Sequence, residues 1–340
     1  MIKNTFLTAA AGMVPLAAYV RRGERGEKAM MADAYEPGYL KLHRSGELKE
    51  RADALWEMMR SCELCPRLCG VNRLEGERGD CNSNDALEVA SYHPHIGEEP
   101  PLVGRRGSGT IFFTNCSLLC VFCINWEVSH RGDGSERRIN ELASMMLTLR
   151  NSGCHNINVV TPTHYSPHIL KALDIAARRG LRLPLVYNTH GWERMEVLEL
   201  LDGVVDIYLT DFKYYDSEMA DLYSPGADNY PEIARKAVYE MHRQVGVAMP
   251  AANGLMYNGL MIRHLVMPNN VGGGREIMSW IAENLPKETY INIMSQYQPY
   301  YQANRFPDIA RPVTAQEYSE VVEHARSLGL TNLDIQAERR

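Results

Sequence analysis

Apolar residues recur every three to four positions in five segments of the chain, and this spacing predicts amphipathic helices. These helices are expected at residues 139–152, 167–179, 193–201, 231–245 and 275–284. Between them lie short apolar runs rich in β-branched and aromatic residues, which are typical of buried strands. The strands are expected at residues 110–114, 157–161, 185–189, 206–211, 260–267 and 290–295.

Strands and helices therefore alternate along the chain. Repeated βα units require a parallel sheet with right-handed crossovers, so the sequence predicts an α/β fold with an open or closed parallel barrel. Another helix is expected at residues 46–60, and Thr314 begins the last helix through a capping box with Glu317. Loops at the carboxyl ends of the strands meet on one side, where such folds place active sites.

The composition fits one large domain with an accessory module, because 45% of the 340 residues are hydrophobic. The formal net charge of -6 and the lack of a long basic run argue against nucleic acid as a partner. The eight cysteines are closely spaced within a long chain. This usage indicates metal binding in an intracellular protein rather than a disulfide framework.

The first 33 residues are expected to form a peripheral extension. Residues 6–20 are mostly apolar but contain Pro15, and they are too few to span a bilayer. A secretory signal or anchor is disfavoured, because Arg21 and Arg22 follow the apolar run rather than precede it. A start at Met30 or Met31 is the other interpretation that stays open.

Three cysteines, Cys116, Cys120 and Cys123, follow the first predicted strand with the spacing C-x3-C-x2-C. Three thiolates can hold three corners of a 4Fe-4S cluster and leave the fourth iron open for chemistry. Two simpler interpretations exist. One is a zinc site that lacks its fourth ligand, and the other is one face of a helix, since positions i, i+4 and i+7 share a side.

A second set of four cysteines lies upstream, at Cys62, Cys65, Cys69 and Cys81. Four thiolates within twenty residues can close a tetrahedral zinc site or hold a second iron–sulfur cluster, and the sequence leaves both open. Cys154 stands alone at the end of a predicted helix and is expected to be structural.

The cysteine triad, with Phe122 before its last member, resembles the motif of the radical SAM superfamily. The upstream string Cys-Glu-Leu-Cys-Pro-Arg-Leu-Cys-Gly-Val-Asn-Arg, which starts at Cys62, resembles the pyruvate formate-lyase activating enzyme-like group often called PflX. This resemblance covers residues 36–332. It implies a partial (β/α)6 barrel over residues 105–340, preceded by a helix and four-cysteine module over residues 34–104.

The resemblance also implies an enzyme. In this superfamily S-adenosylmethionine (SAM) binds the open iron, and an electron from the cluster converts it to a 5′-deoxyadenosyl radical. An activase of this kind takes a glycine hydrogen from a glycyl radical enzyme and receives electrons from a flavodoxin or ferredoxin-type reductant. Oxygen-sensitive cluster chemistry suits the cytoplasm. The alternatives are radical chemistry on a small molecule or another protein residue, and a non-enzymatic iron–sulfur or zinc protein.

Four residues at predicted strand ends are expected to bind the SAM cofactor. Asp211 and Lys213 form an Asp-x-Lys element similar to that of glycyl-radical-enzyme activases, and they share a face if the strand continues through them. Arg263 matches the strand-five arginine of that branch, and its planar cation can hold a carboxylate in two hydrogen bonds. Asn188 can hydrogen-bond a ribose or amino acid group, and His190 is a weaker candidate. A surface ion pair for Asp211 and Lys213, and a buried ion pair for Arg263, are the simpler interpretations.

One departure from the activases concerns the turn after strand two. Activases typically have Gly-Gly-Glu there, which binds the methionine amino group of the cofactor, whereas residues 160–165 contain neither Gly-Gly nor an acid. Thr161, Thr163 and His164 are the candidates to replace it. Gln296 stands at the end of strand six, where activases usually have a histidine.

Overall fold

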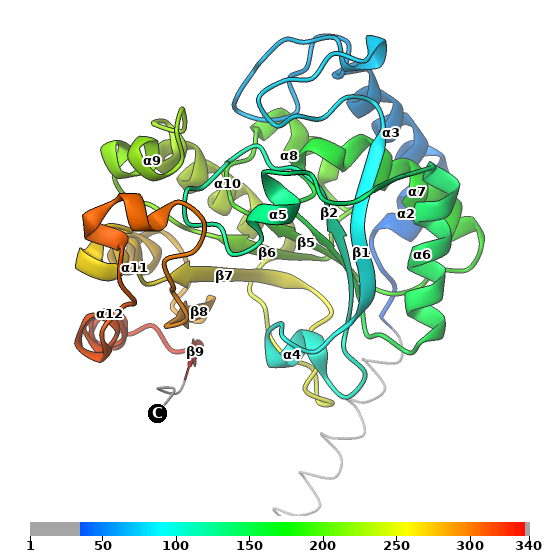
Figure 1. Ribbon diagram of the computed structural model, residues 1–340. Helices are drawn as coiled ribbons and strands as arrows, with labels where there is room; N and C mark the ends of the chain where they lie inside the picture. Colours follow the sequence, from blue (N-terminus) through cyan, green and yellow to red (C-terminus); the bar gives the residue numbers. More distant parts are fainter. Residues whose placement is uncertain (1–34, 337–340) are drawn as a thin grey trace, which may run out of the picture.

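The computed structural model describes residues 35–336 (Figure 1). The predictions for residues 1–33 lie outside this range. No helix among the described residues is both long and apolar enough to cross a membrane.

A single sheet of nine strands organises the described part of the chain, in the order β3-β1-β2-β4-β5-β6-β7-β8-β9. All neighbouring pairs from β2 to β9 are parallel, whereas β1 pairs antiparallel with both β2 and β3. The parallel strands are β2 (Ser108–Phe113), β4 (Ile157–Val160), β5 (Leu185–Thr189), β6 (Ile207–Asp211), β7 (Gly259–Leu265), β8 (Tyr290–Met294) and β9 (Leu333–Ile335). The two edge strands β3 and β9 are not paired with each other, so the sheet is open.

The six predicted strands are confirmed as β2 and β4 to β8. Three strands were missed: β1 (Leu87–His95), β3 (Ser135–Arg137) and β9. β1 contains Pro94 and two histidines and is largely exposed beyond its first residues, so it lacks the apolar run that identifies a buried strand. β3 and β9 have three residues each, which is too short for a periodic pattern.

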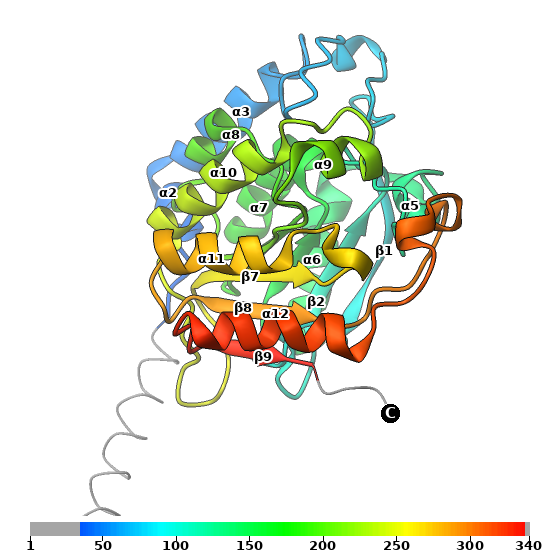
Figure 2. The ribbon, with the colours of Figure 1, turned by 90° about the vertical axis from the view of Figure 1, so that its left-hand side faces the viewer.

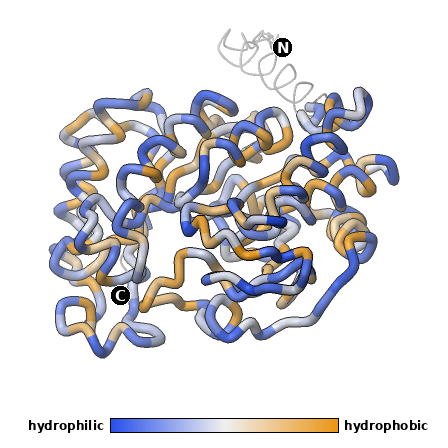
Figure 3. The backbone as a smooth tube through the Cα atoms, turned by 90° about the horizontal axis from the view of Figure 1, so that it is seen from above, coloured by the Kyte–Doolittle hydropathy of each residue, from blue (hydrophilic) through white to orange (hydrophobic). Residues whose placement is uncertain are grey.

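Helices cover the outer face of the parallel sheet, and the predicted ones are confirmed to within a few residues. They are α6 (Ile139–Asn151), α7 (Ser166–Arg178), α8 (Met195–Leu201), α10 (Tyr230–Val245), α11 (Gly274–Asn284) and α12 (Ala315–Ser327). Figure 2 shows α11 and α12 lying along β7, β8 and β9. The capping box of Thr314 and Glu317 is confirmed at the start of α12. Figure 3 shows hydrophobic and hydrophilic residues mixed along the coiled segments of the backbone, as expected when one face of a helix packs on a sheet.

The N-terminal segment packs on the same outer layer. The helices α2 (Tyr39–Ser45) and α3 (Glu47–Glu57) contact α7, and α3 also contacts α8. The four-cysteine segment follows α3 and lies on the same side of the sheet as the short helices α5 (Trp126–Ser129) and α9 (Ser217–Tyr223) (Figure 1).

The segment between β1 and β2 closes the opposite end of the sheet. It contains the short helix α4 (Pro100–Val103), and the Leu102 carbonyl accepts a hydrogen bond from Asn156, the residue just before β4. Leu102 is fully buried with residues of β5, β6 and β7. The inner face of the sheet is therefore covered at its amino end and accessible at its carboxyl end.

Candidate active site

The cysteine triad lies on a loop that leaves the carboxyl end of β2. This loop is not helical before α5, so the helix-face interpretation of the spacing is wrong. Asn115 and Leu119 adopt positive φ values of 67° and 57°, which turn the chain on either side of Cys116. Such values are strained for leucine, and a strained loop must be held by its surroundings. Cys120 is buried, and Cys116 and Cys123 are half-buried.

All three cysteines line a cavity of about 620 Å3 that opens at the carboxyl edge of the sheet. This size is within the usual range for a cofactor or substrate site. The same cavity is lined by Asn188, Asp211, Lys213 and Arg263, the residues predicted to bind SAM. The structure therefore brings every catalytic and cofactor-binding candidate into one space, although they come from four different strand ends and loops.

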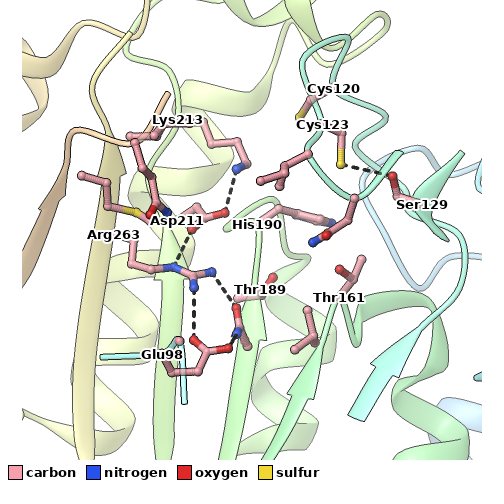
Figure 4. Close-up of a pocket in the computed structure, with 18 of the residues that line it drawn as sticks. Glu98, Cys120, Cys123, Ser129, Thr161, Thr189, His190, Asp211, Lys213 and Arg263 are labelled. Carbon is pink, nitrogen blue, oxygen red and sulfur yellow. Dashed lines mark hydrogen bonds and ion pairs between the residues drawn. The ribbon is translucent and has the colours of Figure 1, made fainter. Parts of the chain in front are cut away.

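A partly buried charge network joins the four predicted SAM-binding residues, and Figure 4 labels three of them, Asp211, Lys213 and Arg263. One oxygen of Asp211 accepts from Lys213 Nζ at 2.7 Å, and the other accepts from Arg263 Nε at 2.8 Å. Arg263 also donates to Asn188 Oδ1 at 2.6 Å. Burial alone would raise the pKa of Asp211, but the charges of Arg263 and Lys213 outweigh it and hold that pKa at about 2.

This network changes two expectations from the sequence. The side chains of Asp211 and Lys213 are only 19% and 18% exposed, so they do not form the surface ion pair of the simpler interpretation. Arg263 is engaged by Asp211 and Asn188, and its remaining terminal nitrogen lies 3.6 Å from Glu98. Arg263 thus forms the ion pair of the simpler interpretation, and its binding of the cofactor carboxylate stays a prediction.

Two hydroxyl groups contact the cysteine thiols, and sequence reasoning missed both. Ser224 Oγ lies 3.1 Å from Cys120 Sγ and is itself 2.9 Å from the Tyr214 hydroxyl. Ser129 Oγ lies 3.2 Å from Cys123 Sγ. Hydrogen bonds to sulfur tune the potential of a cluster, so these serines are suited to that role.

His190, the weaker candidate, also lines the cavity. Its Nδ1 accepts from the Trp192 backbone N–H at 3.1 Å, so Nε2 carries the proton and donates to Ser117 Oγ at 3.0 Å. Burial, reinforced by the charge of Lys213, lowers the pKa of His190 to about 3. The neutral ring therefore braces the loop between Cys116 and Cys120.

The candidate cofactor contacts in the turn after strand two, taken together with Gln296, fall into two groups. Thr161 lines the cavity with a positive φ of 55°, and Gln296 lines it as well. Thr163 instead donates to Glu193 at 2.6 Å, and His164 Nε2 contacts the Thr114 carbonyl at 2.8 Å. These two side chains support the loops and are not among the residues that line the cavity.

Two further acids reach the cavity from the segment before α4. Glu98 lies against Asn188 and Arg263, and burial raises its pKa to about 7. Glu99 is 4% exposed and accepts from Asn292 at 2.9 Å. The pair enters from the amino end of the sheet, so it makes the cavity floor acidic, opposite the cysteine loop.

The four upstream cysteines gather in one turn-rich segment. Cys62, Cys65 and Cys81 are buried and Cys69 is half-buried. Burial raises the pKa of Cys65, and the nearby thiols of Cys81, Cys62 and Cys69 raise it further. A Cβ on Gly79 would lie 2.4 Å from Cys69 Sγ, so the backbone approaches that thiol closely and requires glycine.

Metal binding by either cysteine set stays a prediction. Between residues 35 and 336, no group of three or more His, Cys, Asp or Glu side chains is arranged as a metal site. The chemistry of the donors nevertheless fits a cluster at the triad. Burial raises the pKa of Cys116 to about 12, and Cys120 and Cys123 add to that rise because their thiols are close. Three thiols that line one cavity are the donor type that iron–sulfur clusters use.

The buried acid Glu193 gives a prediction about pH. Burial raises its pKa from 4.5 to about 7, although Thr163 and Thr189 donate to it. The folded state then holds this proton more tightly than the unfolded chain. The free energy of unfolding should therefore fall as pH rises from about 4.5 through about 7, by up to roughly 3 kcal/mol.

The measurement is a urea titration of the metal-free protein and of Glu193→Gln, at about pH 5 and about pH 8. All other titrating groups are common to both proteins, so the difference in pH dependence isolates Glu193. The variant should lose less stability than the wild type between the two pH values. Identical losses would mean that Glu193 does not carry a raised pKa.

The fold and cavity define an α/β protein with a cysteine loop and a buried charge network at the carboxyl edge of its sheet. No protein-family model matches the chain. The sequence is 32% identical over 283 residues to the uncharacterized protein MJ0674 of Methanocaldococcus jannaschii, covering 80% of this chain and 76% of that protein. The chain belongs to the family of that protein.

Two solved structures are similar to part of the chain. Methylornithine synthase has a TM-score of 0.42 and 14% identity, over 65% of this chain and 60% of its own length. A radical SAM methyltransferase from Sphaerobacter thermophilus has a TM-score of 0.43 and 12% identity, over 68% of this chain and 67% of its own. The chain thus spans less than two thirds of methylornithine synthase. The architecture described above follows from this chain's own strand pairing.

Proposed function

We propose that this chain is a radical SAM enzyme. The observation that carries the proposal is that Cys116, Cys120 and Cys123 open into the same cavity as the buried Asp211–Lys213–Arg263 network. Among the described residues that line this cavity there is no fourth cysteine. A cluster held there keeps one iron free of protein sulfur.

In this proposal the three thiolates would hold a 4Fe-4S cluster, which, once reduced, would supply with SAM a 5′-deoxyadenosyl radical. The chain's own residues bind and orient the cofactor. Lys213 and Asn188 present a cation and an amide to the cavity. Asp211 and Arg263 fix both of them, because each is hydrogen-bonded to one member of that pair.

For the substrate, we propose that the enzyme resembles a glycyl-radical-enzyme activase and acts on a protein. The supporting observation is the mouth of the cavity, where Ile124 is 63% exposed and Tyr300 is 42% exposed. An exposed apolar side chain and an exposed aromatic one suit a peptide entering from outside. A flavodoxin or ferredoxin-type protein would supply the electron, and oxygen-sensitive chemistry would place the enzyme in the cytoplasm.

A second candidate is radical chemistry on a small molecule. The acidic cavity floor formed by Glu98 and Glu99 favours it. These two acids line the inner end of the cavity, opposite the cysteine loop. A substrate that carries an amino group would be attracted to such a floor.

The first test is turnover of SAM. Anaerobically reconstituted protein, once reduced, should convert SAM to 5′-deoxyadenosine and methionine. A protein that holds its iron and is reduced, but forms no 5′-deoxyadenosine, would instead support a non-enzymatic iron–sulfur protein.

The second test separates the two substrates. With a glycyl radical enzyme as substrate, an activase gives a spectroscopic doublet on the partner and transfers the glycine deuterium to 5′-deoxyadenosine. Deuterium transfer only from an amine-bearing small molecule would favour the second candidate.

A further inference from the structure

Arg67 links the two cysteine sets. It lies between Cys65 and Cys69 in the four-cysteine segment, but its side chain reaches the loop of the catalytic triad. Its Nε donates to the Ser117 carbonyl at 2.8 Å, and a terminal nitrogen donates to the Leu118 carbonyl at 3.4 Å. Both carbonyls belong to residues between Cys116 and Cys120.

The same guanidinium also holds the segment behind Cys120. Its other terminal nitrogen donates to the Pro225 carbonyl at 2.7 Å. Pro225 follows Ser224, whose hydroxyl contacts Cys120 Sγ. A Cβ on Gly226 would lie 2.5 Å from this Arg67 nitrogen, so glycine keeps the approach open. One side chain thus fixes both the loop that carries Cys120 and the hydroxyl that contacts its sulfur.

An aromatic ring completes this contact. The guanidinium lies 5.2 Å from the centre of the Trp192 ring, at a distance typical of a cation–π interaction. The Trp192 backbone donates to His190, which in turn contacts Ser117. Arg67 and His190 therefore brace the same residue of the triad loop from two sides.

The position of Arg67 depends on the four-cysteine segment. The chain turns there through a positive φ of 47° at Leu68, whose N–H donates to the Cys65 carbonyl at 3.1 Å. A metal bound by Cys65 and Cys69 would fix the backbone on both sides of Arg67. No carboxylate in the described part of the chain forms an ion pair with Arg67, so the partners of its charge are backbone carbonyls and the Trp192 ring.

We propose that Arg67 is a positioning residue through which metal binding at Cys62, Cys65, Cys69 and Cys81 orders the loop that carries Cys116 and Cys120. The proposal rests on the proposed function for the role of the triad, and on the predicted metal binding by the four upstream cysteines. It goes further, because it makes the upstream metal a requirement for a well-formed catalytic loop.

The test measures loop order without any cluster. In the full chain, Cys116, Cys120 and Cys123 are replaced by serine, so that added Zn2+ binds at the upstream set only. Amide hydrogen exchange is then followed over residues 115–123, with and without Zn2+. In this background we expect Zn2+ to slow exchange in the loop roughly tenfold, because an ordered anchor suppresses local opening.

Two variants in the same background identify the carrier of this effect. Arg67→Gln should still bind Zn2+ but show no slowing in the loop, and Arg67→Lys should recover part of it. Arg60→Gln is the matched control, because Arg60 is exposed and, within residues 35–336, its side chain pairs with Glu57 alone. Equal slowing in Arg67→Gln and the background protein would overturn the proposal. So would a failure of Zn2+ to bind, or Zn2+ binding with no slowing at all.

A second measurement uses the enzyme with its native cysteines. Removing the positive charge behind the triad loop should lower the midpoint potential of the triad cluster in Arg67→Gln, whereas Arg67→Lys should keep it near the wild-type value. A potential unchanged in Arg67→Gln would contradict the placement of that charge.

The two proposals can fail separately. Loop ordering without SAM turnover would refute the proposed function alone, and turnover without loop ordering would refute only the role of Arg67.

Discussion

Replacing Cys120 with alanine is expected to abolish the formation of 5′-deoxyadenosine. Cys120 is the most deeply buried of the three triad cysteines, at 8% exposure, and its sulfur is held between the triad loop and Ser224. Two remaining thiolates cannot hold three corners of a cluster. The loss should exceed the roughly 10–100-fold effects seen when only a residue hydrogen-bonded to a metal ligand is changed.

The matched control for this variant is Cys154→Ala. Cys154 is also buried, but it is not among the residues that line the cavity. It should keep its iron content and its turnover of SAM, measured by chromatography of the products. Wild-type turnover in Cys120→Ala would show that the cluster ligands have been assigned wrongly.

Replacing Asp211 with alanine is expected to reduce both stability and cofactor binding. Asp211 is the shared partner of Lys213 and Arg263, so its removal leaves two largely buried cations without the carboxylate they share, and only Arg263 keeps another acid, Glu98, at 3.6 Å. Breaking a buried pair in this way typically costs about 3–5 kcal/mol. The free energy of unfolding of the metal-free protein, from urea titration, measures this cost. Affinity for SAM should fall with it, because Lys213 loses the contact that orients it.

The pH dependence of the same variant gives an independent check. The pKa of Asp211 is lowered to about 2, so its stabilising effect is complete above the usual pKa near 4 and is lost as pH falls towards 2. The deficit of Asp211→Ala should therefore be full at neutral pH and shrink in acid.

A surface pair provides the control for Asp211→Ala. Glu232 and Lys236 are 71% and 62% exposed and lie four residues apart on α10, so Glu232→Ala should cost only a few tenths of a kcal/mol. A cost for Asp211→Ala no larger than that of this control would contradict the buried network.

Much of the site could be predicted because parallel strands end on one side. The apolar runs located the strands, and the polar residues just after them had to converge once the sheet was parallel. This is why Asn188, Asp211 and Arg263 were found together although they are up to 75 residues apart in the chain. The spacing of the triad added the cysteine loop.

The acidic floor could not be predicted in this way. Glu98 and Glu99 precede β2 and enter from the amino end of the sheet, and Glu99 contacts Asn292 across 193 residues. No local periodicity reports a contact of that range. The missed strand β1 has a different cause, because a half-exposed antiparallel strand needs no apolar run.

The contacts of Arg67 and Ser224 could not be predicted from the sequence either. Both act through backbone carbonyls or a thiol rather than through a charged partner. Every residue has a backbone carbonyl, so a side chain that binds one cannot be recognised from the type of residue it contacts. The only available signal was the place of Arg67 between two cysteines.

Mössbauer spectroscopy of the reduced, anaerobically reconstituted protein, with and without SAM, tests the central claim most directly. The account predicts that SAM changes the signal of a single iron, about one quarter of the cluster at Cys116, Cys120 and Cys123. A cluster at this loop whose four irons are all unaffected by SAM, or a loop that binds no cluster, would contradict it.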